Sequence, residues 1–243
     1  MYMPRQAIFH PTKEHRFRMR GKEIFRIEAL SDAVFAFSVS LLVASLEVPQ
    51  TFNELQIITK GAIPFFLTVA LVFLFWYRQY IFFRRFGLSD FTIILLNFAY
   101  LAVIIFYLYP LKFLFSLLIS SWGGIDLFAE ANEKGLVVLS NDAFPQLIIL
   151  FSTGYFLIWL IIYLLHKHIL SSAAILDFTA FEKLLTQKEV RGALWNAFVG
   201  LAALVFAYFR LEIIAGTCYL FIPFVLMLNQ YLFKAKVKKL PKR

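Results

Sequence analysis

The sequence predicts an all-α membrane protein with about six transmembrane helices and both termini in the cytoplasm. Of its 243 residues, 61% are hydrophobic and only 16% are charged, and the mean hydropathy is +0.75. The apolar runs recur along the chain, and each is about 20 residues long, enough helix to span a bilayer core of roughly 30 Å. This composition excludes a soluble globular domain and makes the lipid bilayer the main surroundings of the chain.

Six apolar runs define the predicted spans. They cover residues 25–47, 61–83, 91–111, 144–165, 192–209 and 211–233. Pro64 falls in the first turn of its span, where a missing N–H is tolerated, whereas Pro223 lies in mid-span and predicts a kink. Only a few polar residues around Arg210 and Glu212 separate the last two runs, so these are expected to form a tight helical hairpin.

The segments outside the spans complete the predicted organisation. Residues 118–143 contain several glycines and acids and are expected to form one large outer loop. Residues 179–187 predict a short interfacial helix on the cytoplasmic side. The chain therefore divides into a basic N-terminal segment at 1–24, a six-helix transmembrane domain at 25–233 and a basic tail at 234–243.

The basic residues determine the predicted orientation. An even number of spans puts both termini on one side of the membrane, and Lys and Arg are enriched on the cytoplasmic side. Most basic residues fall before the first span, near the second and fourth connections and in the tail: Arg5, Lys13, Arg16, Arg18, Arg20, Lys22, Arg26, Arg78, Arg84, Arg85, Lys167, Lys183, Lys188, Arg191, Lys234, Lys236, Lys238, Lys239, Lys242 and Arg243. Both termini are therefore predicted to be cytoplasmic. The net charge of +9 follows from this topology and does not indicate nucleic-acid binding.

The first span is unusual because it carries small residues on two faces. A helical wheel places one set on a broad face and a serine stripe nearly opposite to it. The first set is Ala29, Ala33, Ala36, Ser40 and Ala44, and the stripe is Ser31, Ser38 and Ser45. Small residues allow close approach of other helices or of water, so this helix is expected to be enclosed by protein or water instead of lipid.

The first span also contains a carboxylate, which costs at least about 2.5 kcal/mol in a membrane unless it is paired or wet. Asp32 lies about 9 Å of helix rise from Arg26, at the cytoplasmic end of the first span. The same number of residues, counted inward from the cytoplasmic ends of the second and third spans, reaches further polar residues. The predicted buried cluster comprises Arg26, Ser31, Asp32, Arg78, Gln79 and Asn97. Such a cluster is either a structural clip between helices or a direct ion site.

Arg26, Ser31 and Asp32 of the first span lie at the spacing of the motif Arg, three residues, then Phe-Ser-Asp, with Leu30 in place of Phe. This motif is the first-span signature of the prokaryotic transmembrane protein 175 family of potassium channels, which the chain resembles here. Trp76 ahead of a basic helix end and Asn97 in the third span are also similar, so the resemblance covers about residues 26–110. The family usually has a His one turn after this Trp, where the present chain has Gln79 and Tyr80.

The resemblance implies a potassium-permeable channel in a prokaryotic plasma membrane, assembled as a homotetramer with four first spans around a central pore. Such channels lack a looped carbonyl filter, and this sequence contains no Thr-Val-Gly-Tyr-Gly. The implied pore positions are Phe37, Ser40, Leu41 and Ala44. A ring of Phe37 side chains would form a hydrophobic constriction, unless Phe37 is ordinary helix packing, and Ser40 would offer oxygen ligands to a cation. Monovalent cations are implied only as permeating species, without a cofactor.

Two other classes of protein compete with this interpretation. A secondary transporter would use an intramembrane carboxylate such as Asp32 to couple a proton or ion, but paired repeats and interrupted helices are not evident. A membrane enzyme or metal protein would rely on His166 and His168. These two residues diverge by about 160° on a helix and flank a basic helix end, and the sequence contains none of the common hydrolase or nucleotide-binding motifs. The sequence therefore predicts no enzyme.

Overall fold

The computed structural model describes residues 17–44, 48–122, 127–128, 135, 137–140 and 143–240. Its regular elements within these ranges are helices: α1 (Arg26–Ala44), α2 (Phe52–Lys60), α3 (Ala62–Phe86), α4 (Phe91–Trp122), α6 (Phe144–Ser171), α7 (Ala180–Tyr208), α8 (Glu212–Cys218), the 3-10 turn η1 (Tyr219–Phe221) and α9 (Ile222–Lys238). Six stretches are long and apolar enough to cross a membrane, with residues 212–238 counted as one. The predicted all-α architecture with six spans is confirmed.

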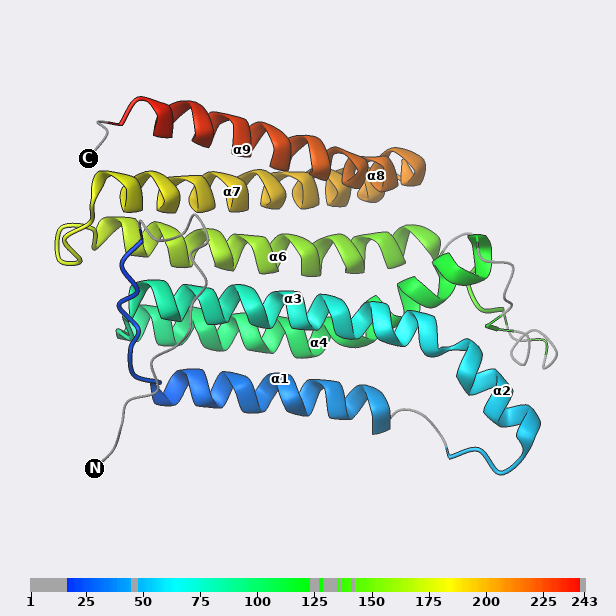
Figure 1. Cartoon of the computed structure of the whole chain (residues 1–243). Coiled ribbons are helices and arrows are strands. Elements are labelled where there is room, and N and C mark those ends of the chain that lie inside the picture. Colours follow the sequence, from blue (N-terminus) through cyan, green and yellow to red (C-terminus); the bar gives the residue numbers. More distant parts are fainter. Residues whose placement is uncertain are drawn as a thin grey trace, which may run out of the picture.

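The long helices lie side by side in a bundle (Figure 1). α1 packs against α3 and α4, α4 packs against α6, α6 packs against α7, and α7 packs against α8 and α9. Large side chains such as Phe83, Ile93, Tyr100 and Ile158 are almost fully buried in the middle of this series. The first and last spans therefore lie at opposite edges of the bundle, and α1 has only α3 and α4 as its main packing partners.

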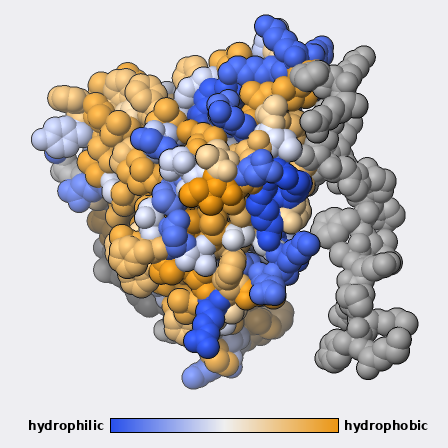
Figure 2. Space-filling model, turned by 90° about the vertical axis from the view of Figure 1, so that its left-hand side faces the viewer, coloured by the Kyte–Doolittle hydropathy of each residue, from blue (hydrophilic) through white to orange (hydrophobic). Residues whose placement is uncertain are grey.

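The two ends of the bundle differ in charge. α1, α4 and α7 begin, and α3, α6 and α9 end, at the same end of the bundle (Figure 1). We call this the basic end, after Arg18, Arg20, Lys22, Arg84, Arg85, Lys167, Lys183, Lys236 and Lys238. Figure 2 looks onto this end and shows hydrophilic side chains gathered over it. The positive-inside rule predicts that the basic end faces the cytoplasm.

Residues 17–25 form a strap across the basic end, which appears as a dark blue trace in Figure 1. The Gly21 N–H donates to the Arg84 carbonyl at 3.1 Å, and the Arg84 guanidinium donates back to the Gly21 carbonyl at 2.7 Å. A Cβ at Gly21 would lie 2.3 Å from the Phe83 carbonyl oxygen, so only glycine allows this approach. The described part of the predicted N-terminal segment is therefore fixed to the end of α3; residues 1–16 of that segment lie outside the described residues.

The strap also reaches the start of α7 through Glu182, whose side chain is fully buried. Its carboxylate accepts from the Arg18 backbone N–H at 2.8 Å and from the Arg20 guanidinium at 2.9 Å. Glu182 and Thr179 form a capping box, in which each side chain accepts the backbone N–H of the other residue. One carboxylate thus caps α7 and anchors the chain that leads into α1.

The structure corrects the fifth span. Residues 179–187 do not form a separate interfacial helix, because α7 continues without a break from Ala180 to Tyr208. No proline interrupts this stretch, and Gly192 allows close packing, since a Cβ there would lie 2.6 Å from the Asn229 amide nitrogen. α4 and α6 also extend past their predicted ends, by eleven and six residues respectively. Apolar content predicted the spans well, but helices continue beyond the apolar core.

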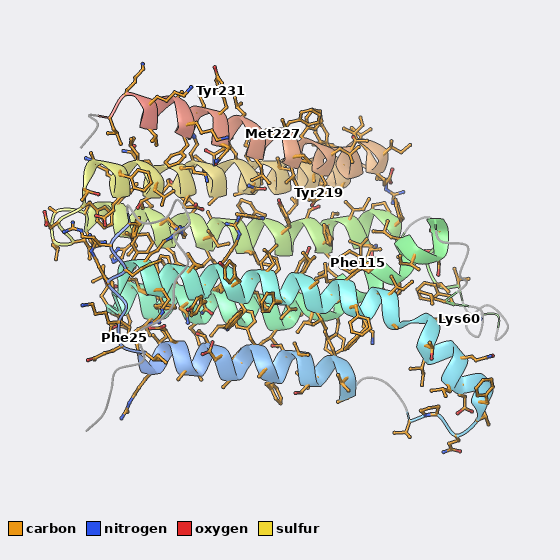
Figure 3. All side chains as sticks on the ribbon, viewed as in Figure 1. Phe25, Lys60, Phe115, Tyr219, Met227 and Tyr231 are labelled. Carbon is orange, nitrogen blue, oxygen red and sulfur yellow. The ribbon has the colours of Figure 1, made fainter. Side chains whose placement is uncertain are left out.

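The sixth span is interrupted, but not as predicted. Pro223 lies in the first turn of α9 and the break precedes it, as the 3-10 turn Tyr219–Phe221 between α8 and α9. Proline has no N–H to offer the carbonyl one turn earlier, which favours a change of helix type at that point. The Tyr219 hydroxyl donates to Ser152 of α6 at 2.8 Å, and Figure 3 shows Tyr219 on the α6 side of this segment.

The segment that follows α1 contains a helix that hydrophobicity did not predict. α2 begins after Thr51, whose hydroxyl accepts the Glu54 N–H at 3.2 Å while the Glu54 carboxylate accepts the Gln50 N–H at 2.6 Å. Figure 3 places Lys60, the last residue of α2, at the end of the bundle opposite to the basic end. Most of the predicted outer loop at 118–143 lies outside the described residues, although α4 continues into it as far as Trp122.

Candidate functional site

The four predicted pore positions lie on the side of α1 that none of the other described helices covers. Phe37 is 59% exposed, Ser40 and Ala44 are exposed, and Leu41 is half-buried. The Ser40 hydroxyl donates to the Ala36 carbonyl at 3.0 Å, which leaves its oxygen lone pairs on the uncovered side. These positions span about two turns of α1 and are at least partly exposed in the single chain.

The serine stripe of α1 points the other way. Ser31 and Ser38 are 1% and 0% exposed, together with Phe35 and Leu42 on the same buried face. The Ser38 hydroxyl donates to the Val34 carbonyl at 2.7 Å and is satisfied within its own helix. Because Ser31 and Ser38 face α3 and α4, this stripe does not offer a second surface for a pore. Ser45 lies outside the described residues.

Ser31, Gln79 and Asn97 form a buried polar triad that joins α1, α3 and α4. The Gln79 amide donates to the Ser31 hydroxyl at 2.9 Å and also to the Asn97 carbonyl oxygen. The Asn97 amide donates to the Ser31 hydroxyl at 3.0 Å, and Ser31 donates to the Ile27 carbonyl at 2.7 Å. All three side chains are at most 6% exposed. Their sequence-based grouping in one layer matches the structure, since amides buried without partners would be costly.

Asp32 does not join this triad. The prediction that Asp32 is buried and pairs with Arg26, Arg78, Gln79 or Asn97 is wrong for this chain. Asp32 is exposed, and its carboxylate accepts a hydrogen bond of 2.7 Å from the indole nitrogen of Trp76. The physical reason is the helical period, because Asp32 points about 100° away from its neighbour Ser31 and towards the uncovered side of α1.

Aromatic packing holds Trp76 in place for this contact. Its ring stacks on Tyr80 at a centroid distance of 5.6 Å and lies against Phe73 at 5.3 Å. Sequence reasoning identified Trp76 only as part of the resemblance and missed its role as the partner of Asp32. The indole N–H is a hydrogen-bond donor and a carboxylate is an acceptor. A tryptophan in the span next to an intramembrane Asp was therefore the sequence feature that could have predicted this contact.

The two arginines of the predicted cluster lie elsewhere. Arg26 is exposed at the first residue of α1. The side chain of Arg78 projects from the side of α3 that faces away from Asp32. Its guanidinium lies 4.0 Å from the Glu189 carboxylate and 4.8 Å from the centre of the Trp159 ring. Arg78 directly precedes Gln79 in the chain, and this step of about 100° around the helix turns the two side chains toward different helices.

The two candidate histidines have separate structural contacts. His166 is buried and its Nδ1 lies 2.8 Å from the Ile162 carbonyl, whereas the Nε2 of His168 lies 2.7 Å from the Asp90 carboxylate. Burial acts to raise the pKa of Asp90, but the hydrogen bonds from His168 and from the Ile93 N–H outweigh it and lower the pKa. Within the described ranges, no three His, Cys, Asp or Glu side chains group as metal ligands.

Comparison with known proteins gives consistent relatives. The family profile described as "Endosomal/lysosomal potassium channel TMEM175" matches residues 26–107. A protein of Marivirga tractuosa named "Potassium channel" is 34% identical over 221 residues, which cover 88% of this chain and 90% of the relative. The helices that carry the triad and the uncovered face of α1 thus coincide with the part of the chain that the family profile matches.

Two solved structures share the fold. A variant of the potassium channel MtTMEM175, crystallised with a nanobody fusion protein, has a TM-score of 0.79 at 33% identity, covering 90% of this chain and 98% of that chain. A TMEM175 homologue from Chamaesiphon minutus has a TM-score of 0.51 at 18% identity, covering 84% of this chain and 96% of that chain, and shows similarity of fold alone. The sequence match along nearly the whole chain and the structural match agree. This chain belongs to the TMEM175 family of potassium channels and is not an enzyme.

Proposed function

We propose that four copies of this chain form a potassium-permeable channel in the plasma membrane of a prokaryotic cell, with the uncovered faces of four α1 helices around the pore. The observation that carries the proposal is the composition of that face. In the single chain, five of the ten exposed residues of α1 are small or bear a hydroxyl group: Ala29, Ala33, Ala36, Ser40 and Ala44. The other five are Arg26, Leu30, Asp32, Phe37 and Val43. A lipid-facing helix has no need of such residues, whereas helices that meet around a narrow axis do.

The opposite edge of the bundle provides the contrast. α9 exposes Phe224, Met227 and Leu228, which are bulky apolar residues suited to acyl chains. Figure 3 shows Met227 and Tyr231 on the outer side of α9. The two edge helices therefore differ in the kind of surface they offer, and α1 is the better candidate for the axis of an assembly.

Phe37 and Ser40 would have different roles in the proposed pore, one as a constriction and the other as a source of oxygen ligands. Four Phe37 rings at the axis would form an apolar constriction that excludes ions until it widens and fills with water. Ser40 lies one turn further from the basic end and would provide hydroxyl oxygens to a partly dehydrated cation. Hydroxyl groups favour the less strongly hydrated potassium ion over sodium, and Leu41 and Ala44 complete the lining. Potassium is in this proposal the permeating ion, and no cofactor is involved.

The decisive experiment is ion flux from purified protein in liposomes, with potassium and sodium gradients compared and the oligomeric mass measured in the same preparation. A tetramer with single-channel currents larger for potassium than for sodium is the expected result. A monomer, or turnover at the rate of a secondary transporter, would contradict the proposal. In the second case Asp32 would become the candidate for the coupling carboxylate.

A further inference from the structure

α1 contains three charged residues, and only one of them points in the direction of the proposed pore. A helical wheel places Arg26 within about 20° of Phe37 and in line with Ala44, about five turns further along the helix. Glu28 and Asp32 point about 160° and 120° away from Arg26. Arg26 is therefore the charged residue of α1 that lies closest to the axis of the proposed assembly.

The Arg26 side chain is exposed, and no ion pair or hydrogen bond joins its guanidinium to another residue in the part of the chain that the structure describes. Each acid of α1, in contrast, has a partner. The Glu28 carboxylate is 8% exposed and accepts the Phe25 N–H at 3.1 Å, and the Asp32 carboxylate accepts from the Trp76 indole at 2.7 Å. These contacts hold both carboxylates on sides of α1 that are turned away from Arg26. The positive charge of Arg26 is thus not neutralised by a direct contact within the single chain.

Arg26 also lies at the cytoplasmic entrance of the proposed pore. It is the first residue of α1, about 16 Å of helix rise from Phe37 on the side of the basic end. Before Arg26 the chain turns away from the helix axis, because residues 17–25 run across the basic end toward Arg84 and Glu182 (Figure 1). Four Arg26 side chains would therefore be the first groups of α1 that a cation meets on its way from the cytoplasm into the pore.

We propose that four Arg26 side chains form a ring of positive charge at this entrance and make the channel rectify, with potassium current into the cytoplasm larger than current out of it. The ring depends on the tetrameric pore proposed above. A cleft of one charge raises the local concentration of the opposite ion, and by the same field it lowers that of ions of its own sign. The ring acts on potassium that enters from the cytoplasm, whereas potassium from the outer side reaches it only after Phe37. Lys22 and Glu23, the exposed strap residues next to Arg26, carry opposite charges and leave the effect to Arg26.

The test records current–voltage curves in inside-out membrane patches from cells that produce the channel, with equal potassium concentrations on both sides. The screening length is about 30 Å at 10 mM salt and about 3 Å at 1 M salt. The ratio of inward to outward current should therefore exceed one at low salt and approach one at high salt. Arg26→Gln should raise the outward current at low salt by at least about twofold and leave the inward current nearly unchanged. Arg26→Lys keeps the charge and should rectify like the unmodified chain.

A second measurement changes the charge at this position without a further substitution. Arg26→Cys is combined with Cys218→Ser, because Cys218 is the single cysteine of the chain. A positively charged methanethiosulfonate reagent applied from the cytoplasmic side should restore rectification, and a negatively charged reagent of similar size should reverse it. Equal effects of the two reagents would overturn the proposal, because the side chain would then act through its size and not through its charge.

The matched control is Lys236→Gln, which removes the same charge at the basic end but from α9, at the opposite edge of the bundle. Equal loss of rectification in this control would overturn the proposal, because the currents would then follow general surface charge. Unchanged currents in an intact Arg26→Gln tetramer would also overturn it and leave the proposed function standing. Loss of assembly in both Arg26→Gln and Arg26→Cys would show that Arg26 is a structural contact, which again contradicts the ring. A chain without potassium current would contradict the proposed function itself.

Discussion

The indole nitrogen of Trp76 donates a hydrogen bond of 2.7 Å to the Asp32 carboxylate and so joins α3 to the uncovered side of α1. The triad of Ser31, Gln79 and Asn97 lies beside it on the buried side of the same helix. α1 is thus held to the bundle by two polar contacts on different faces. The triad is buried inside the bundle, whereas the contact between Trp76 and Asp32 lies on the exposed side of α1.

Trp76→Phe keeps the ring stack on Tyr80 but removes the donor to Asp32. We expect a smaller fraction of the proposed tetramer to remain intact after mild heating, with the potassium-to-sodium permeability ratio of the remaining channels unchanged. Asp32→Ala should have the same effect, and Asp32→Asn a weaker one, because the amide oxygen still accepts. Trp195→Phe on α7 is the control. Normal tetramer yield combined with altered selectivity in Asp32→Ala would instead identify Asp32 as an ion site.

Gln79→Leu removes two hydrogen bonds of the buried triad and leaves the Asn97 carbonyl oxygen without the donor it has in the triad. The free energy of unfolding should fall by about 1–3 kcal/mol, the cost of unsatisfied buried polar groups. Thermal unfolding in detergent measures the change. Gln146→Leu, an exposed glutamine of α6, should have little effect. Equal melting temperatures for both variants would show that the triad contributes nothing.

Phe37→Ala and Phe37→Ser should both raise cation flux. In the proposed pore, a smaller or polar side chain at this ring lowers the cost of wetting the constriction. Liposome flux assays with potassium measure the effect. Phe98→Ala is the control, since Phe98 is similarly exposed at 67% but belongs to α4. If flux does not rise while the tetramer is intact, Phe37 is not the constriction.

Ser40→Ala should lower the potassium-to-sodium permeability ratio while current persists, because it removes a ring of hydroxyl oxygens without changing the width of the pore much. Ser38→Ala is a close control, two residues away on the buried face, where its hydroxyl already donates to the Val34 carbonyl. Reversal potentials under mixed gradients give the ratio. A change in Ser38→Ala without one in Ser40→Ala would reject the assignment of the pore to the uncovered face.

Gly21→Ala should destabilise the protein, because the added Cβ would lie 2.3 Å from the Phe83 carbonyl and displace the strap from α3. Gly216→Ala provides the matched control, since a Cβ there meets nothing within 4 Å. Protease sensitivity at the basic end and the melting temperature should both change in the first variant only. Identical behaviour of the two variants would mean that the strap is not needed for stability.

The sequence predicted best those features that depend on one physical property, such as the hydrophobicity of a span. Hydrophobic length located every span. The depth count placed Asp32, Arg78 and Asn97 in one layer, and the structure has Ser31, Gln79 and Asn97 together at about that depth. The count gives the position of a residue along the helix axis, but not the neighbouring helix toward which its side chain points. Asp32 and Arg78 each lie one residue from a member of the triad, and that step turns both side chains toward other partners.

Other features carried signals that hydrophobicity alone overlooks. α2 and α7 both begin with Thr, two residues and then Glu, the capping-box pattern at Thr51 and Thr179. The contact between Arg78 and Glu189 joins spans that are not consecutive, so no local spacing predicts it. The strap depends on backbone hydrogen bonds at Gly21, and their partners at the end of α3 follow only from the tertiary fold.

The strap also determines how α1 can move. It is fixed to Arg84 and Glu182 at one end of the helix, and the Glu28 carboxylate accepts the Phe25 N–H where the strap becomes α1. If α1 tilts about this anchored end, the pivot lies near Phe25, and Phe37 lies about 18 Å further along the helix. The contacts of Ser31 and Asp32 with α3 and α4 lie closer to the pivot and would move less. A tilt of only about 5° would carry Phe37 about 1.6 Å sideways while the pivot stays in place. Small rotations at the basic end would thus cause larger displacements at the proposed constriction.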